Sequence, residues 1–291
     1  MIDCRQTFDL QGLIMVHKVA LVTGASSGIG AATARRLHEG GLVVYAGARR
    51  VERMQPLADA GIQVRSLDVC DDSSLSRVIE EIITDNGRID VLINNAGYGS
   101  YGSVEDVPLS EGRYQLEVNL FGMARLIQLV LPRMRAAGSG KIINISSMGG
   151  HFGEPLGAWY HASKFAVEGF SDSLRLELHD FGIDVILIEP GAIESEWSTG
   201  AVESAERYSS NTAYAPQVRA MRALYACADR MASGPEIVAE VILKSINAAR
   251  PKPRYAVPLA ARLIITAYRV VPDRILDTSR RTLMRVVHQD R

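Results

Sequence analysis

Short apolar runs alternate with segments of helical spacing through most of the chain. The runs are rich in β-branched residues and lie at residues 19–22, 42–46, 62–67, 89–93, 142–145 and 185–188. Their apolar residues are largely consecutive rather than alternate, which is typical of strands that are covered on both faces. We therefore predict a strand at each run.

The segments between the runs carry the signals of amphipathic helices. Asp71-Asp72-Ser73 precedes an apolar face over residues 75–83, and Ser233-Gly234-Pro235-Glu236 precedes another over residues 237–246. The second tetrapeptide fits a capping box with proline in the first turn. Repeated alternation of strand and helix predicts an α/β fold, a doubly wound parallel sheet of about seven strands with helices on both faces.

The two ends of the chain depart from this pattern. Residues 1–15 show no period, so we expect a disordered N-terminal extension, with Met15 as an alternative start. Residues 16–258 are predicted to form a single domain, and residues 259–291 a basic, amphipathic helical extension. The apolar stripe of this extension is Leu259, Leu263, Ala267 and Val270, and its positive charge comes from Arg262, Arg269, Arg274, Arg280, Arg281 and Arg285.

Two interpretations of the extension stay open. A basic amphipathic helix can lie on an anionic membrane surface, as a peripheral contact. Alternatively, it packs on the body of the protein or on a second subunit with its arginines in water, and we favour this second interpretation.

Composition narrows the class of protein. The 291 residues carry a net charge of -1 and are 47% hydrophobic, which fits a globular protein and argues against a nucleic-acid partner. We find no apolar stretch of about 18 residues that would span a membrane. Three scattered cysteines and six histidines without ligand spacing predict no disulfide framework and no metal site. We expect a cytoplasmic protein, with membrane association left open.

Small or polar residues follow four of the predicted strands. These segments are Thr23-Gly24-Ala25-Ser26-Ser27-Gly28-Ile29-Gly30, Asn94-Asn95-Ala96-Gly97, Ser146-Ser147 and Pro190-Gly191. Because ligands of open parallel sheets bind outside the carboxyl ends of the strands, we expect these segments to line one site. The first segment leads into a helix, so its glycines would let the backbone and the helix N-terminus approach a pyrophosphate.

The residues after the second strand indicate which dinucleotide binds. An acidic residue about 20 positions past the glycine loop favours NAD, whereas an arginine favours NADP. Here the strand ends in Ala48-Arg49-Arg50, with no carboxylate before Glu52. Arginine can neutralise a 2′-phosphate, so we predict NADP(H) rather than NAD(H), and Arg49 as the phosphate ligand.

Tyr160 and Lys164 are four residues apart and would share a helix face. A nearby ammonium favours the phenolate form, which would lower the pKa of the tyrosine from about 10 and suit it to acid–base catalysis. Ser147 could hydrogen-bond a substrate carbonyl. Asn119 lies inside a helical pattern over residues 114–131, where asparagine is a mediocre helix former, which suggests a specific bond.

Together these motifs resemble the short-chain dehydrogenase/reductase family in its single-domain form. The resemblance rests on Thr23-Gly24-x-x-x-Gly28-x-Gly30, Asn94-Asn95-Ala96-Gly97, Asn119, Ser147, Tyr160-x-x-x-Lys164 and Pro190-Gly191. It covers residues 16–250 and implies a Rossmann-like fold.

The resemblance implies a role for each matching residue. Tyr160 would be the acid/base, Lys164 would lower its pKa and bind the nicotinamide ribose, Ser147 would orient the carbonyl, and Asn119 would hold a water in the proton relay. The implied cofactor-binding residues are Gly24, Ser26, Ser27, Gly28, Ile29, Gly30, Arg49, Asp68, Val69, Asn95, Ala96, Gly97, Tyr160, Lys164, Pro190, Gly191 and Ile193.

The resemblance also implies an activity and partners. We expect an NADP(H)-dependent oxidoreductase that transfers hydride between nicotinamide and the carbonyl or alcohol carbon of a hydrophobic substrate, steroid-like, retinoid-like or another lipid. The segment 192–234 would cover that substrate. A homodimer or homotetramer is expected, through the helices that carry Asn119 and Tyr160. The competing hypothesis is a sensor or scaffold that binds NADP without turnover.

Overall fold

The computed structural model describes the backbone from residue 17 to residue 289 and the side chains as far as residue 282. The predicted N-terminal extension, residues 1–15, and the side chain of Arg285 lie outside the described residues.

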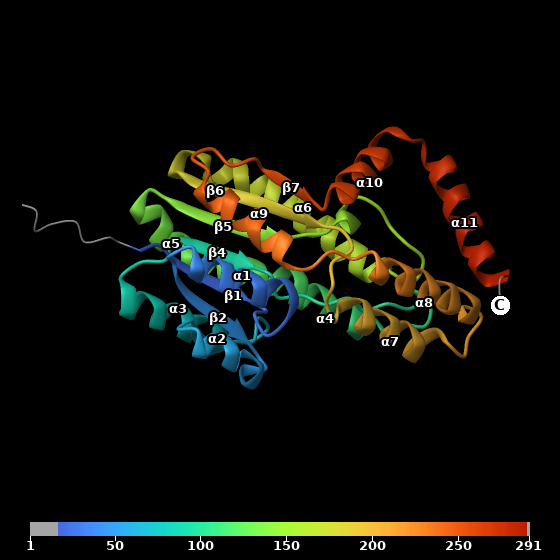
Figure 1. Ribbon diagram of the computed structural model, residues 1–291, viewed down its shortest axis with the longest axis horizontal. Coiled ribbons are helices and arrows are strands. Elements are labelled where there is room, and N and C mark those ends of the chain that lie inside the picture. Colours follow the sequence, from blue (N-terminus) through green and yellow to red (C-terminus); the bar gives the residue numbers. More distant parts are fainter. Residues whose placement is uncertain (1–16, 290–291) are drawn as a thin grey trace, which may run out of the picture.

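One parallel sheet of seven strands forms the centre of the molecule (Figure 1). The strand order is β3-β2-β1-β4-β5-β6-β7. Strands β1 to β3 are therefore added toward one edge of the sheet, and strands β4 to β7 toward the other. The strands are β1 (Val19–Thr23), β2 (Val43–Ala48), β3 (Gln63–Ser66), β4 (Val91–Asn94), β5 (Gly140–Ile145), β6 (Ile183–Pro190) and β7 (Arg254–Val257). This is the predicted doubly wound, Rossmann-like α/β fold.

Helices cover both faces of the sheet (Figure 1). They are α1 (Gly28–Glu39), α2 (Gln55–Asp59), α3 (Asp72–Asn86), α4 (Leu109–Leu116), α5 (Gly122–Ala137), α6 (Ala158–Leu178), α7 (Trp197–Ser209), α8 (Ala215–Arg230), α9 (Glu236–Asn247), α10 (Leu259–Val270) and α11 (Asp273–Gln289). Residues of α1, α2 and α9 pack into one apolar core, and residues of α3, α5 and α6 into the other. The consecutive apolar residues of the strands serve both cores, as two-faced burial requires.

The two predicted helix starts differ in outcome. Asp71 caps α3 as predicted, because its carboxylate accepts a hydrogen bond of 3.0 Å from the N–H of Ser73. The capping box predicted at Ser233 is wrong: α9 begins at Glu236, with Pro235 at the N-cap. Ser233 instead forms a bridge with Ile193, which takes its backbone away from the helix start.

Two further elements differ from the sequence pattern. The seventh strand, β7, was not among the six apolar runs, because Arg254 and Tyr255 break its pattern. The helix predicted over residues 114–131 is not continuous: α4 ends at Leu116, and a π-helical turn, Glu117–Phe121, separates it from α5. Such turns insert one extra residue per turn and often occur at functional sites.

The C-terminal extension is helical, as predicted, and consists of α10 and α11. Ala261 and Ile265 face the body of the protein and are buried. By contrast, three residues of the predicted stripe, Leu259, Leu263 and Val270, are 63 to 73% exposed. Among the described residues, no helix has the length and apolar character needed to span a membrane.

Candidate active site

The glycine loop joins the carboxyl end of β1 to the start of α1. Gly24 and Gly28 have φ angles of +66° and +52°, a region that glycine adopts without strain. A Cβ on Gly24 would lie 2.8 Å from the Cα of Ala96, so the loop has no room for a larger residue there. Ser27 is the N-cap, and its side chain makes no capping bond within the described chain. The first-turn N–H groups of α1 are therefore free to bind an anion.

The segment after β4 is tied to this loop. The Asn95 side chain donates hydrogen bonds to the carbonyls of Thr23 (2.9 Å) and Gly24 (3.2 Å). The Thr23 hydroxyl in turn accepts the N–H groups of Asn95 and Ala96, both at 3.0 Å. These bonds fix the predicted cofactor-binding residues of two strands as one rigid surface, which fits the phosphates of a dinucleotide.

Arg49 lies at the carboxyl end of β2, on the same edge of the sheet. It is exposed, and its guanidinium contacts the Tyr114 hydroxyl at 3.2 Å. Its neighbour Arg50 reaches Ser26 of the glycine loop at 3.4 Å and also pairs with Glu196 at 3.3 Å. Arg49 is thus the arginine of this pair with no carboxylate partner among the described contacts, and its charge is available to an anion.

The other predicted cofactor residues lie along the same edge. Asp68 and Val69 follow β3, and the Asp68 carboxylate accepts the N–H of Cys70 at 3.0 Å. Pro190 ends β6, and the N–H of Gly191 donates to the Val257 carbonyl at 2.8 Å. Ser27, Ile29 and Gly30 lie between the end of β1 and the first turn of α1, Gly97 follows β4, and Ile193 follows β6. The predicted cofactor residues therefore follow the carboxyl ends of the parallel strands.

Tyr160 and Lys164 lie one turn apart on α6, opposite Ser147 at the end of β5. Burial raises the pKa of Tyr160 to about 12, although a hydrogen bond with Ser147 lowers it in part. Burial lowers the pKa of Lys164 to about 8, against the negative charge of Glu168. The Lys164 Nζ donates to the Ile145 carbonyl at 2.8 Å and lies 5.9 Å from the centre of the Tyr160 ring.

The pKa of Tyr160 thus shifts in the direction opposite to the predicted one. The phenol is buried, whereas the Lys164 ammonium is directed to a backbone carbonyl. Loss of hydration therefore outweighs the lowering effect of the Ser147 hydroxyl, and the negative charge of Glu154 raises the pKa of Tyr160 further. At neutral pH the phenol is protonated and the ammonium is charged, so this pair is arranged to donate a proton.

Asn119 lies in the π-helical turn and is buried. Its carbonyl oxygen accepts the N–H of Tyr98 at 3.1 Å, and its amide donates to the Tyr98 carbonyl and the Ser163 hydroxyl, both at 3.0 Å. Ser163 donates to the Tyr160 carbonyl at 2.7 Å. The specific bonds expected of Asn119 therefore connect the turn to the helix that carries Tyr160.

Other aromatic rings lie close to Tyr160. The Trp197 ring, at the start of α7, lies 4.9 Å from the Tyr160 ring, and the Tyr101 ring lies 5.8 Å away. Tyr225 of α8 contacts Tyr101 at 6.0 Å. The segment 192–234 therefore covers Tyr160, and the wall it presents is apolar and aromatic.

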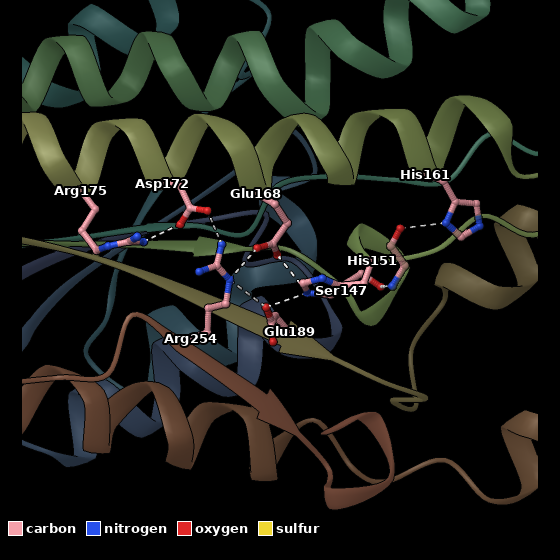
Figure 2. Close-up of polar contacts among 9 residues, drawn as sticks. Ser147, His151, His161, Glu168, Asp172, Arg175, Glu189 and Arg254 are labelled. Carbon is pink, nitrogen blue, oxygen red and sulfur yellow. Dashed lines mark hydrogen bonds and ion pairs between the residues drawn. The ribbon is translucent and has the colours of Figure 1, made fainter. Parts of the chain in front are cut away.

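A row of charged groups lies between α6 and the sheet, next to Ser147 (Figure 2). Arg254 of β7 pairs with Glu168 at 3.0 Å, with Glu189 at 3.3 Å and with Asp172 at 2.7 Å. His151, four residues after Ser147, pairs with Glu189 at 2.9 Å. Glu168 and Glu189 are buried, and burial raises the pKa of Glu168. Arg254 thus joins β6 and α6, and His151 joins the Ser147 loop to β6.

Three of these groups could in principle hold a metal ion. One donor atom each of His151, Glu168 and Glu189 lie within 4.8 Å of one another. The Arg254 guanidinium already contacts both carboxylates, which gives them a cationic partner. The interpretation of the site as metal-free stays a prediction.

The sequence reasoning missed this row of charges. Glu168 is four residues after Lys164, a spacing that places both on one helix face and could have indicated it. Glu189 and Arg254 carried no such signal, since they meet only because β6 and β7 pair.

Comparison with known proteins places the chain in a family. The family model for short chain dehydrogenase matches residues 18–206. The chain is 37% identical over 267 residues to 3-ketodihydrosphingosine reductase of Bacteroides thetaiotaomicron. The matched region covers 90% of this chain and 96% of that protein.

Solved structures agree with this placement. A short-chain dehydrogenase from Streptomyces avermitilis superposes with a TM-score of 0.78 at 34% identity, over 92% of this chain and 95% of its own. A metagenomic short-chain oxidoreductase in complex with NADP superposes with a TM-score of 0.65 at 30% identity, over 82% of this chain and 96% of its own. On the match to the family model and the likeness to these relatives, this chain is an oxidoreductase of the short-chain dehydrogenase/reductase family.

Proposed function

We propose that the protein is an NADP(H)-dependent oxidoreductase that interconverts a carbonyl and an alcohol on a hydrophobic substrate. The observation that carries the proposal is the buried Tyr160 phenol, with the buried Lys164 ammonium 5.9 Å from the centre of its ring and one helical turn away. A sensor or scaffold that only bound the cofactor would need no buried acid of this kind.

The residues act on the carbonyl oxygen. When bound, NADPH supplies the hydride that adds to the carbonyl carbon. Ser147 donates a hydrogen bond to the carbonyl oxygen, and Tyr160 transfers its phenolic proton to that oxygen as negative charge develops. The Lys164 ammonium stabilises the phenolate that remains. In the direction of alcohol oxidation, the same phenolate would take the proton back.

The glycine loop and the edge of the sheet fit a dinucleotide. The free N–H groups at the start of α1 would bind the pyrophosphate, and Asp68 and Val69 would contact the adenine. Arg49 would neutralise the 2′-phosphate, consistent with a structural relative that was solved in complex with NADP. Lys164 and Tyr160 would bind the nicotinamide ribose, and Ile193 its carboxamide region.

The wall around Tyr160 supports a hydrophobic substrate. Tyr101, Leu156, Val218 and Met221 form an apolar cluster with Tyr160, and Trp197 packs against it. The relative at 37% identity has a name that gives a keto compound as its substrate. We therefore assign a bulky apolar ketone or alcohol, such as a lipid, steroid-like or retinoid-like molecule.

Exposed apolar residues support two kinds of partner. Phe121 (54% exposed) and Phe165 (49%) lie on the π-helical turn and on α6, the helices through which a homodimer or homotetramer would form. Leu259, Leu263 and Val270 of α10 lie beside the exposed Arg262 and Arg269. This face has the character of a peripheral contact with anionic lipid.

The proposal is tested by NADPH consumption with a panel of ketones of increasing size. Tyr160→Phe should lower turnover about 10²–10⁴-fold, because the general acid is lost while the ring stays in place. The affinity for NADPH should stay within a few-fold of the wild type. Tyr255→Phe, on β7, is the matched control and should keep full turnover. A Tyr160→Phe variant with near wild-type turnover would reject the assigned role.

A further inference from the structure

Arg280 of α11 is held by the loop that leads into α6. Its guanidinium lies 4.9 Å from the centre of the Phe152 ring and 4.5 Å from that of Tyr268, a residue of α10. The two rings stack on one another at 4.3 Å. Arg280 also donates a hydrogen bond to the Gly153 carbonyl. A side chain from the C-terminal extension is therefore tied to residues 152 and 153.

The same loop contacts the catalytic helix. The Phe152 ring lies 6.0 Å from the imidazole of His161, the residue next to Tyr160. The Glu154 carboxylate lies 4.0 Å from the His161 Nε2 and 3.3 Å from the Tyr225 hydroxyl. Figure 2 places His161 at the Ser147 end of the charged row. Any movement of this loop would therefore change the surroundings of Tyr160.

The extension also reaches the segment that covers the substrate. From α10, α11 runs back toward α8 and contacts it (Figure 1). Loop 151–157, α8 and α11 thus meet at the carboxyl edge of the sheet, on the side where an apolar substrate would approach Tyr160. The favoured interpretation of the extension, as packed on the body of the protein, agrees with these contacts.

We propose that Arg280 is a positioning residue that fixes loop 151–157 and so sets which substrates fit beside Tyr160. This inference rests on the proposed function. A planar guanidinium suits the role, because it binds two aromatic faces and a carbonyl at once, and because it stays charged at every physiological pH. Removing it frees the loop without touching the groups that carry out the chemistry.

The test compares Arg280→Met with Arg281→Met. Methionine keeps the length and apolar stem of the side chain but removes the charge and the donor. Arg281, the next residue, is exposed and serves as the matched control. For a bulky apolar ketone, Arg280→Met should raise KM about tenfold, the effect of losing a desolvated cation–π contact. For a small ketone, kcat and KM should stay within about threefold, and so should the NADPH affinity.

A second measurement does not depend on turnover. Hydrogen exchange of the amides of Phe152, Gly153, Glu154 and Leu156 should be faster in Arg280→Met than in the wild type and in Arg281→Met. Equal exchange in all three proteins would overturn the inference, and so would equal changes in KM for the large and the small ketone. Absence of NADPH-dependent turnover in the wild type would instead reject the proposed function, while the exchange measurement would still decide the role of Arg280.

Discussion

Replacing Arg254 with methionine tests the energetics of the charged row behind the active site. Arg254 is the partner of both Glu168 and Glu189, whose side chains are only 9% and 4% exposed. Methionine fills a similar volume but leaves two buried carboxylates without their main counter-charge. Breaking a buried pair by removing one partner costs about 3–5 kcal/mol, and we expect a loss of stability of that size at pH 8.

The loss should depend on pH, with a sign set by Glu168. Burial already raises the pKa of Glu168, and the Arg254 charge opposes the rise. Without Arg254 the folded-state pKa rises further above the unfolded value of about 4.3. Such a group favours folding below its unfolded pKa, and this contribution is lost as pH rises through the folded pKa. The destabilisation should therefore be smallest near pH 4 and largest at pH 8.

Urea unfolding followed by circular dichroism at several pH values measures this effect. Arg175→Met is the matched control, because it breaks only the ion pair with Asp172. In that pair the Arg175 side chain is 31% exposed and the Asp172 side chain is 42% exposed. An exposed pair of this kind contributes about 0–1 kcal/mol. A loss below about 1 kcal/mol for Arg254→Met, or one that does not change with pH, would refute the reasoning.

The remaining predictions concern the cofactor, the catalytic ammonium and the extension. Arg49→Ala should weaken NADPH binding far more than NADH binding, as measured by fluorescence titration; equal losses would remove the phosphate assignment. We expect the alkaline limb of the kcat–pH profile near the Lys164 pKa of about 8, which the Glu168 charge raises. Glu168→Gln should therefore move this limb to lower pH, and an unmoved limb would contradict the reasoning. Leu263→Asp should abolish any co-sedimentation with anionic vesicles while leaving reductase activity intact, and undiminished sedimentation would exclude α10 as the contact.

The sheet and its cofactor edge could be predicted from sequence because their signals are local. A two-faced strand needs apolar residues at consecutive positions, and a loop that approaches a phosphate needs glycines between a strand and a helix. Gly24, Gly28, Tyr160 and Lys164 could therefore be found without coordinates. Asp71 could be recognised as a helix cap for the same reason, since it bonds to Ser73, two residues away.

Other features escaped the sequence because they depend on contacts between distant segments. Ser233 looked like a helix cap until its pairing with Ile193 was known, and the stripe on α10 gave no sign of which way it would face. The pKa of Tyr160 depends on burial, which no spacing reveals, so its direction was predicted wrongly.

The sequence by itself determined the fold class, and it predicted the dinucleotide edge and the proton-transfer residues, since each depends on short-range spacing. Only the tertiary structure decided the protonation of Tyr160, the charged row around Arg254 and the contact of Arg280 with the active-site loop. Residues 168, 189 and 254 lie on three different elements, and 152 and 280 are 128 positions apart in the numbering. Their interactions exist only once the chain has folded and excluded water from between them.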